Sequence, residues 1–199
     1  LAVAKILVEL GMDSESVAAA LLHDVVEDTG VPLADIEKQF GGGIAQLVNG
    51  VTKLGRIPYT SKEEQQAENL RKMLLAMAQD IRVVIIKLAD RLHNARTFQY
   101  LPDEKRRYKA LETMEIYAPI ADRLGIRRIK EELEDTSLRY LDPIAYAEIE
   151  SQLAEREERQ RFLASIKQRI FDRVKVEHPN AYIEGRVKSI YGIYRKVYM

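Results

Sequence analysis

Residues 18–30, AAALLHDVVEDTG, decide how the rest of the chain is interpreted, because an apolar run here suddenly carries one imidazole and three carboxylates. If the stretch is one helix, with about 100° between successive residues, His23, Asp24, Glu27 and Asp28 share one face and the leucines and valines cover the other. Its Thr-Gly end puts Glu27 and Asp28 at the negative pole of the macrodipole, where each carboxylate is disfavoured by roughly 0.3–1 kcal/mol. The pattern therefore predicts a bound divalent metal ion.

The composition is that of a globular protein without a preferred charge. Of the 199 residues, 46% are hydrophobic and 31% are charged, which is ordinary for a fold with one sizeable core. Lysine and arginine total 31, as do aspartate and glutamate, so charge does not favour nucleic acid or an anionic membrane as a partner. The lack of cysteine excludes disulfides and thiolate ligands and fits a reducing compartment, for which we expect the cytoplasm. No apolar run reaches the ~18 residues of a membrane span.

Glycine and proline divide the first half of the chain into segments of helical length. Between these breaks, apolar residues recur at intervals of three and four, which is typical of amphipathic helices. Residues 81–89, IRVVIIKLA, are rich in β-branched side chains that favour a strand, but the segment continues to Asn94 without a breaker and so favours a buried helix. We therefore predict that the first half is all-α.

The second half is expected to consist of charged helices followed by a basic tail. Residues 144–176 combine helical periodicity with dense charge, which is typical of a connector bordered by solvent. Residues 182–187, YIEGRV, could form a strand before a basic and aromatic segment that ends at Met199. Because the chain begins at Leu1 within a helical pattern, we expect it to be part of a longer protein.

His23 and Asp24 need a third ligand, and Asp90 is the best candidate. Adjacent helical residues diverge by about 100° and can bind one ion from two directions. Asp90 follows an apolar run, where an isolated carboxylate would be costly to bury without a partner. Asn94 and Thr97 follow on the same helical face and offer neutral hydrogen-bonding groups suited to a nucleobase or sugar.

Each of these features also has a purely structural interpretation. A histidine–aspartate pair is most often only a hydrogen-bonded pair, and the acidic pair that follows it could be a solvated helix end. Asp90 could simply pair with the arginine that follows it. The combination of His23, Asp24, Glu27, Asp28 and a distal Asp90 is much more specific than any one member.

Two motifs, LHDVVEDT at residues 22–29 and KLADRLHN at residues 87–94, resemble the HD-domain signatures of the RelA/SpoT homologues, the alarmone synthetase-hydrolases. The resemblance covers nearly the whole chain, because it continues through NLRKM at 69–73, EIYAP at 115–119, ADRLGI at 121–126 and ELED at 132–135. Family members that only synthesise alarmone have lost the histidine–aspartate pair and the paired acids. The resemblance therefore implies a bifunctional type that is competent in hydrolysis.

The family resemblance implies an all-α fold in three parts. These are an HD-domain helical bundle at residues 1–140, a helical connector at residues 141–178 and the start of a synthetase domain, a short α/β fragment, at residues 179–199. The implied activity is Mn²⁺-dependent removal of the 3′-pyrophosphate from guanosine tetraphosphate or pentaphosphate.

The resemblance also implies a role for each residue of the motifs. His23, Asp24 and Asp90 would ligate the metal ion, whereas Glu27 and Asp28 would orient and deprotonate the attacking water from outside the coordination sphere. The family's first metal-ligating histidine, in a His-Pro dipeptide, would lie immediately before the first residue. Substrate contacts are implied for Asn94, Thr97, Lys53 and Arg56.

The tail, GRVKSIYGIYRK at residues 185–196, resembles the start of the synthetase domain, whose Gly-Arg-x-Lys segment binds the phosphates of ATP. Phosphate contacts are implied for Arg186 and Lys188. The acidic Mg²⁺ ligands of that domain would lie beyond the last residue, so we expect no alarmone synthesis from these 199 residues. The chain departs from the common family pattern at Val187, Ser189 and Gly192.

Three functional hypotheses remain open at this point. The first is a pyrophosphohydrolase, the second is a regulatory module that binds alarmone without turnover, and the third is a fragment of a GTP pyrophosphokinase. A nucleic-acid binder is the least favoured class, because the charge is balanced and no aromatic platform interleaves with a basic patch. The expected partners are guanine alarmones and, for a full-length protein only, the ribosome. If the first hypothesis is right, His23, Asp24 and Asp90 converge on one site.

Overall fold

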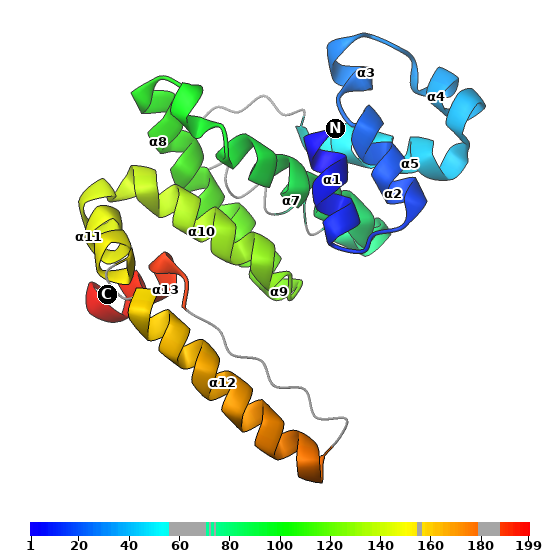
Figure 1. The fold of residues 1–199 in the computed structure, drawn as a ribbon. Coiled ribbons are helices and arrows are strands. Elements are labelled where there is room, and N and C mark those ends of the chain that lie inside the picture. Colours follow the sequence, from blue (N-terminus) through cyan, green and yellow to red (C-terminus); the bar gives the residue numbers. More distant parts are fainter. Residues whose placement is uncertain (56–70, 72, 74, 155–156, 179–187) are drawn as a thin grey trace. The chain divides into compact units, whose positions relative to one another are not determined.

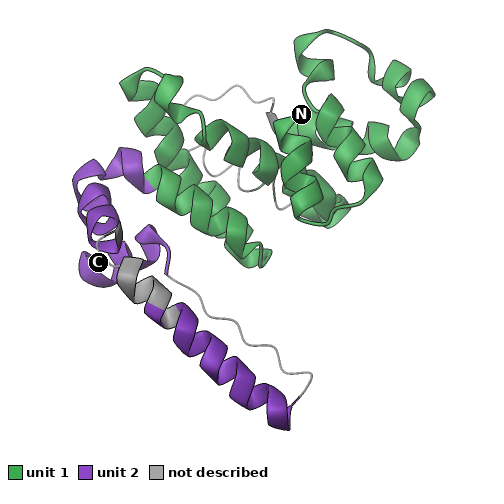
Figure 2. Cartoon of the chain, in the orientation of Figure 1, with its two compact units in different colours: residues 1–137 green, residues 138–199 purple. Residues whose placement is uncertain are grey.

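The computed structural model describes residues 1–55, 71, 73, 75–154, 157–178 and 188–199. The described residues are mostly helical and include no strand, which confirms the all-α fold. They form two compact units, Leu1–Ser137 and Leu138–Met199 (Figure 2). The strand expected at residues 182–187 lies outside the described residues.

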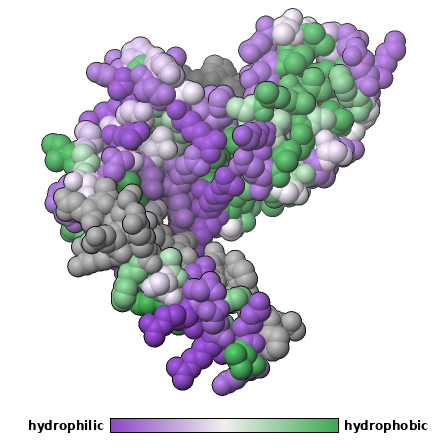
Figure 3. Space-filling view, in the orientation of Figure 1, coloured by the Kyte–Doolittle hydropathy of each residue, from purple (hydrophilic) through white to green (hydrophobic). Residues whose placement is uncertain are grey.

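The first unit is a bundle of helices (Figure 1). Apolar surface gathers over the N-terminal helices on the face shown in Figure 3, while polar side chains cover much of the rest of that face. The helices of this unit are α1 (Ala2–Glu9), α2 (Ser14–Leu22), α3 (Val25–Asp28), α4 (Leu33–Phe40), α5 (Gly42–Gly55), α7 (Ile81–Ala95), α8 (Asp103–Glu112), α9 (Ala118–Arg123) and α10 (Arg127–Leu141), with a 3₁₀ turn η1 (Phe98–Tyr100) and a π-helix η2 (Thr113–Tyr117).

Two aspartates begin the helices that carry the expected site. The side chain of Asp13 accepts a hydrogen bond from the backbone nitrogen of Ser16 at 2.9 Å and caps α2. Asp80 caps α7 in the same way, through the backbone nitrogen of Arg82 at 2.9 Å. The guanidinium of Arg82 links the two helix starts, because it lies 2.8 Å from Asp80 and 3.1 Å from Glu15 of α2. The caps thus define the start of each helix, and Arg82 connects the two starts.

Helix α7 lies in the core of the first unit, in contact with α1, α2, α5 and η2. Val84, Ile86 and Leu88 on this helix have no exposed surface. The segment at residues 81–89 is therefore helical despite its β-branched composition, because burial among other helices outweighs intrinsic propensity. The helix carries Asp90 on its second half and so fixes the position of that carboxylate.

The prediction of one helix through residues 18–29 is wrong. Helix α2 ends at Leu22 and α3 begins at Val25, so that His23 and Asp24 lie in a turn. Leu21, which was expected on the buried face, is 52% exposed. The physical reason is tertiary, because the turn directs the imidazole of His23 to α7, as described below.

The expected end of this segment is confirmed, since α3 stops at Asp28 and Gly30 has a φ of +70°. The electrostatic argument built on that end is nevertheless wrong. A helix of four residues has almost no macrodipole, so Glu27 and Asp28 are not strained by one. The case for a cation must come from the side chains themselves.

The second unit contains the C-terminal end of α10 followed by α11 (Pro143–Ala154), α12 (Glu157–Glu177) and α13 (Ile190–Val197). Helices α11 and α13 contact each other, and two tyrosines of the C-terminal segment hold them together. The hydroxyl of Tyr194 donates to Asp142 at 3.2 Å, and that of Tyr198 donates to Glu148 at 2.6 Å. The helical periodicity predicted for residues 144–176 agrees with α11 and α12, whereas the role of this region as a connector stays a prediction. No helix among the described residues is long and apolar enough to span a membrane.

Candidate functional site

The imidazole of His23 is oriented by the main chain. Its Nδ1 lies 2.8 Å from the carbonyl oxygen of Ala20, and because a carbonyl oxygen can only accept, Nδ1 carries the proton of this bond. The other nitrogen, Nε2, lies 2.9 Å from Oδ2 of Asp24 and 3.7 Å from Oδ1 of Asp90. The structure therefore brings the three expected metal ligands together around His23.

A neutral imidazole in this position would point a lone pair at two carboxylates. The arrangement needs positive charge at Nε2, either a proton or a metal ion. The nearby carboxylate of Asp90 raises the pKa of His23; burial opposes this shift, and the charge of Asp24 adds to it. Nε2 of His23 thus faces carboxylate oxygens from its own turn and from α7.

Asp90 is buried and has a partner on each oxygen. Its Oδ2 lies 2.9 Å from the ammonium of Lys87, and its Oδ1 accepts a hydrogen bond of 2.9 Å from the amide of Asn94. Burial raises the pKa of the Asp90 carboxyl, but the contacts with His23 and Lys87 outweigh burial and hold that pKa well below its usual range. Asp90 is therefore a carboxylate. Its burial agrees with the prediction that it could not stand alone after an apolar run.

The donor set fits a divalent ion by its chemistry. Imidazole nitrogen and carboxylate oxygens suit the intermediate and harder divalent metals, such as Mn²⁺, Fe²⁺ and Zn²⁺. Within the part of the chain that the structure describes, no group of three or more His, Asp or Glu side chains has the spacing of a complete metal site. Nε2 of His23 faces both carboxylates, and a shared role of these three side chains in holding a metal ion stays a prediction.

Glu27 and Asp28, the expected catalytic acids, lie on α3 directly after Asp24, and both are exposed. Exposed carboxylates are in contact with water, which a role outside the coordination sphere requires. Their neighbour Val26 is half-buried and lines a pocket. The structure therefore places the two acids directly after the His23 turn, and only their neighbour Val26 lines the cavity.

The expected substrate-binding residues lie in two places. Asn94 donates to Asp90, and the hydroxyl of Thr97 donates to the main-chain oxygen of Asn94 at 2.9 Å. Both residues are exposed at the end of α7, next to the histidine–aspartate cluster. Lys53 lies on α5 and lines the pocket beside α3 instead, while Arg56 lies outside the described residues.

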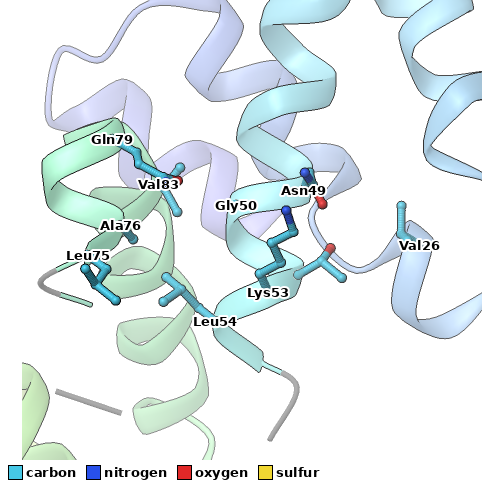
Figure 4. Close-up of a pocket in the computed structure, with 10 residues that line it drawn as sticks. Val26, Asn49, Gly50, Lys53, Leu54, Leu75, Ala76, Gln79 and Val83 are labelled. Carbon is cyan, nitrogen blue, oxygen red and sulfur yellow. The ribbon is translucent and has the colours of Figure 1, made fainter. Parts of the chain in front are cut away.

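The pocket beside α3 has a volume of about 530 Å³, within the size range of small-molecule sites. Lys53 and Asn49 come from α5, Val26 from α3, and Gln79 from the opposite wall (Figure 4). Sequence reasoning missed the amides of Asn49 and Gln79. The signal that was available is the four-residue spacing of Asn49 and Lys53 on a predicted helix. The remaining lining residues are Gly50, Thr52, Leu54, Leu75, Ala76 and Val83.

A buried ionic network follows Asp90 on α7. Arg91 donates from Nη1 to Oε2 of Glu112 at 2.9 Å, and its guanidinium lies 3.9 Å above the ring centre of Tyr117. The ammonium of Lys109 lies 3.0 Å from the same oxygen of Glu112. Arg91 is therefore not the partner of Asp90, and the interpretation of Asp90-Arg91 as an ion pair is wrong. The reason is that adjacent residues of a helix diverge, so the two side chains face different neighbours.

Comparison with known proteins shows what the chain is similar to. Residues 1–127 match the HD domain family. Over 200 residues the chain is 50% identical to a probable guanosine-3′,5′-bis(diphosphate) 3′-pyrophosphohydrolase of Synechocystis, with 98% of this chain and 26% of the relative covered. It is 47% identical over 198 residues to the guanosine-3′,5′-bis(diphosphate) 3′-pyrophosphohydrolase of Haemophilus influenzae, covering 98% of this chain and 29% of the relative.

A third relative combines two activities in its name. Over 197 residues the chain is 47% identical to the bifunctional (p)ppGpp synthase/hydrolase SpoT of Escherichia coli, with 98% of this chain and 28% of the relative covered. The chain thus spans about a quarter of the length of the curated relatives that it matches.

Proposed function

Since the chain belongs to the HD domain family and is similar over nearly its whole length to RelA/SpoT-type proteins, we propose that it is the pyrophosphohydrolase part of a bifunctional alarmone enzyme of the stringent response. Its proposed reaction is hydrolysis of the 3′-pyrophosphate of guanosine tetraphosphate and pentaphosphate. The observation that carries the proposal is the convergence of His23 on two carboxylates, one from its own turn and one from α7.

The proposed metal ligands of this chain are His23, Asp24 and Asp90, and the proposed ion is Mn²⁺. A divalent ion held there would act as a Lewis acid on a phosphate oxygen and offset the charge that develops during the reaction. The protein itself orients the donors, because Ala20 fixes the imidazole and Asn94 holds one oxygen of Asp90. Such support from outside the coordination sphere is what a metal site needs for fixed geometry.

Glu27 and Asp28 are proposed to hold the attacking water and to accept its proton. Water adds to the phosphorus bonded to the 3′ oxygen, that phosphorus–oxygen bond breaks, and the 3′ oxygen takes up a proton, so that GDP or GTP and pyrophosphate are released. This role is supported by the exposure of both acids on α3, directly after the turn that contains His23 and Asp24. A base in this position must be near the metal ligands without being one of them.

The nucleotide is proposed to contact residues at the end of α7 and on α5. Because the amide of Asn94 donates to Asp90, its carbonyl oxygen is the atom left to accept a hydrogen bond from the nucleoside. Thr97 lies beside it, and Lys53 supplies a positive charge in the pocket next to α3. Arg56 completes the proposed substrate set.

The tail is proposed to belong to a synthetase domain, with Arg186 and Lys188 binding phosphate. Lys188 is exposed just before α13, whereas Arg186 lies outside the described residues. We also propose domain boundaries near residues 140 and 178 and a cytoplasmic location. For the full-length protein, we propose a Mg²⁺-dependent synthetase and contact with the ribosome.

The test is release of pyrophosphate from guanosine 3′,5′-bis(diphosphate) with Mn²⁺, combined with measurement of bound metal. Glu27→Gln and Asp28→Asn should each lower turnover by a factor of roughly 100 or more, with metal content unchanged. Asp35→Asn, an exposed acid on α4, is the matched control and should behave like the unmodified protein. Loss of metal in the first two variants would make them ligands, and nucleotide binding without turnover in the unmodified protein would favour the regulatory module.

A further inference from the structure

We propose that Lys87 is a positioning residue for Asp90. Its ammonium balances the negative charge of the Asp90 carboxylate and thereby weakens and tunes the binding of a divalent cation at this site. The inference deepens the proposed function, because it concerns the same metal ligand. Lys87 is three residues before Asp90 on α7, and its ammonium lies 2.9 Å from Oδ2. Nothing in the motif interpretation assigned a role to this lysine.

The pair is too buried to be an ordinary surface ion pair. The side chain of Lys87 is 19% exposed and that of Asp90 is 12% exposed. Exposed ion pairs contribute little because water competes for both charges, whereas a charge removed from water must be matched by a partner. Lys87 and Asp90 therefore depend on each other, and the loss of either charge leaves the other one with less compensation.

The two oxygens of Asp90 have different tasks. Oδ2 faces Lys87, while Oδ1 faces the amide of Asn94 at 2.9 Å and Nε2 of His23 at 3.7 Å. The lysine and the asparagine thus hold the carboxylate group from both sides and present Oδ1 to the imidazole. With Oδ2 already engaged by an ammonium, Oδ1 is the oxygen that Asp90 offers to a cation.

A fixed ammonium next to a metal ligand lowers the affinity of that ligand for a cation. The cation would be attracted by His23, Asp24 and Asp90 but repelled by the ammonium of Lys87. Because the site is partly buried, this repulsion is stronger than it would be between charges in water. Removing the charge of Lys87 should therefore destabilise the protein stripped of metal and tighten its binding of metal. A lysine that only supported the fold would give the opposite sign for the metal, because a disturbed site binds more weakly.

The experiment measures Mn²⁺ affinity by calorimetry on EDTA-treated and dialysed protein, together with urea unfolding with and without Mn²⁺. Lys87→Met should bind Mn²⁺ roughly tenfold more tightly than the unmodified protein, and it should unfold at lower urea without metal. Lys87→Arg keeps the charge and should leave the affinity within roughly a factor of three. Lys38→Met, which removes an exposed lysine on α4, is the control and should change neither quantity.

Two further variants make the outcome unambiguous. Asp90→Asn should abolish the calorimetric signal, which assigns the signal to this site. Lys87→Gln is neutral but can still donate to Oδ2, so it provides the sign of the effect even if Lys87→Met does not fold. Weaker or unchanged Mn²⁺ binding in the neutral variants, or no Mn²⁺ binding at this site in the unmodified protein, would overturn the proposal. Tight Mn²⁺ binding with the expected sign but no pyrophosphate release would instead contradict only the proposed function.

Discussion

Replacement of Glu112 by glutamine is expected to destabilise the first unit by about 3 kcal/mol. The side chain of Glu112 is 5% exposed, and its Oε2 takes both the guanidinium of Arg91 at 2.9 Å and the ammonium of Lys109 at 3.0 Å. Breaking a buried ion pair costs roughly 3–5 kcal/mol. The lower end applies here, because Lys109 is 32% exposed and can be hydrated, and because a glutamine oxygen still accepts a hydrogen bond.

The assay is urea and thermal unfolding of Glu112→Gln at pH 7, compared with Glu104→Gln, an exposed acid on the same helix α8. For a unit of this size, 3 kcal/mol corresponds to a decrease of the unfolding midpoint by roughly 10 °C. The control should stay within about 0.5 kcal/mol of the unmodified protein. A loss below about 1 kcal/mol in Glu112→Gln would refute the claim that this network is desolvated.

The pH dependence provides an independent check on the same residue. Burial raises the pKa of Glu112, but Arg91 and Lys109 outweigh burial and lower that pKa below its ordinary value. A carboxyl with a lowered pKa in the folded state stabilises the fold fully above its pKa in the unfolded chain, about 4.3, and this stabilisation is lost as the pH falls toward the folded value. The difference between the protein and Glu112→Gln should therefore shrink as the pH falls below about 4. A difference that stays constant from pH 7 to pH 3 would contradict the assignment.

Two substitutions on α5 test its packing. In Gly50→Ala the new Cβ would lie 2.7 Å from Cγ2 of Val83. We therefore expect the free energy of unfolding in urea to fall by about 1–3 kcal/mol, and the second change Val83→Ala should relieve this loss. An unchanged stability of the single variant would contradict the close contact of α5 and α7. Thr52→Val removes a buried hydroxyl that has no hydrogen-bond partner among the described residues. The free energy of unfolding should therefore rise by about 1 kcal/mol. A decrease would show that the hydroxyl has a hydrogen-bond partner.

The part of the site that sequence could predict is the part that follows from local chemistry. A carboxylate directly after an apolar run has to be buried with a partner, and Asp90 is so placed. The spacing of glycine, proline and apolar residues likewise predicted the helical character of the described first half, including the ambiguous segment at residues 81–89. These inferences succeed because burial and helix periodicity act over a few residues.

The parts that sequence could not predict depend on contacts between distant segments. The turn at His23 and Asp24 interrupts a pattern that is helical by every local measure, and its cause is the contact of the imidazole with Asp90 on another helix. The pairing of Arg91 with Glu112 joins residues that are 21 positions apart, and no short spacing rule links them. Such contacts are set by the packing of α7 against its neighbours rather than by local propensity.

Release of pyrophosphate from guanosine 3′,5′-bis(diphosphate), measured for the unmodified protein and for Asp90→Asn with Mn²⁺ and with EDTA, is the sharpest test of the proposed hydrolase centre. We predict stoichiometric GDP and pyrophosphate from the unmodified protein with Mn²⁺, and none with EDTA or with Asp90→Asn. Pyrophosphate release that persists in EDTA, or that is unaffected by the loss of the Asp90 charge, would contradict the claim that His23, Asp24 and Asp90 form a metal-dependent hydrolase centre.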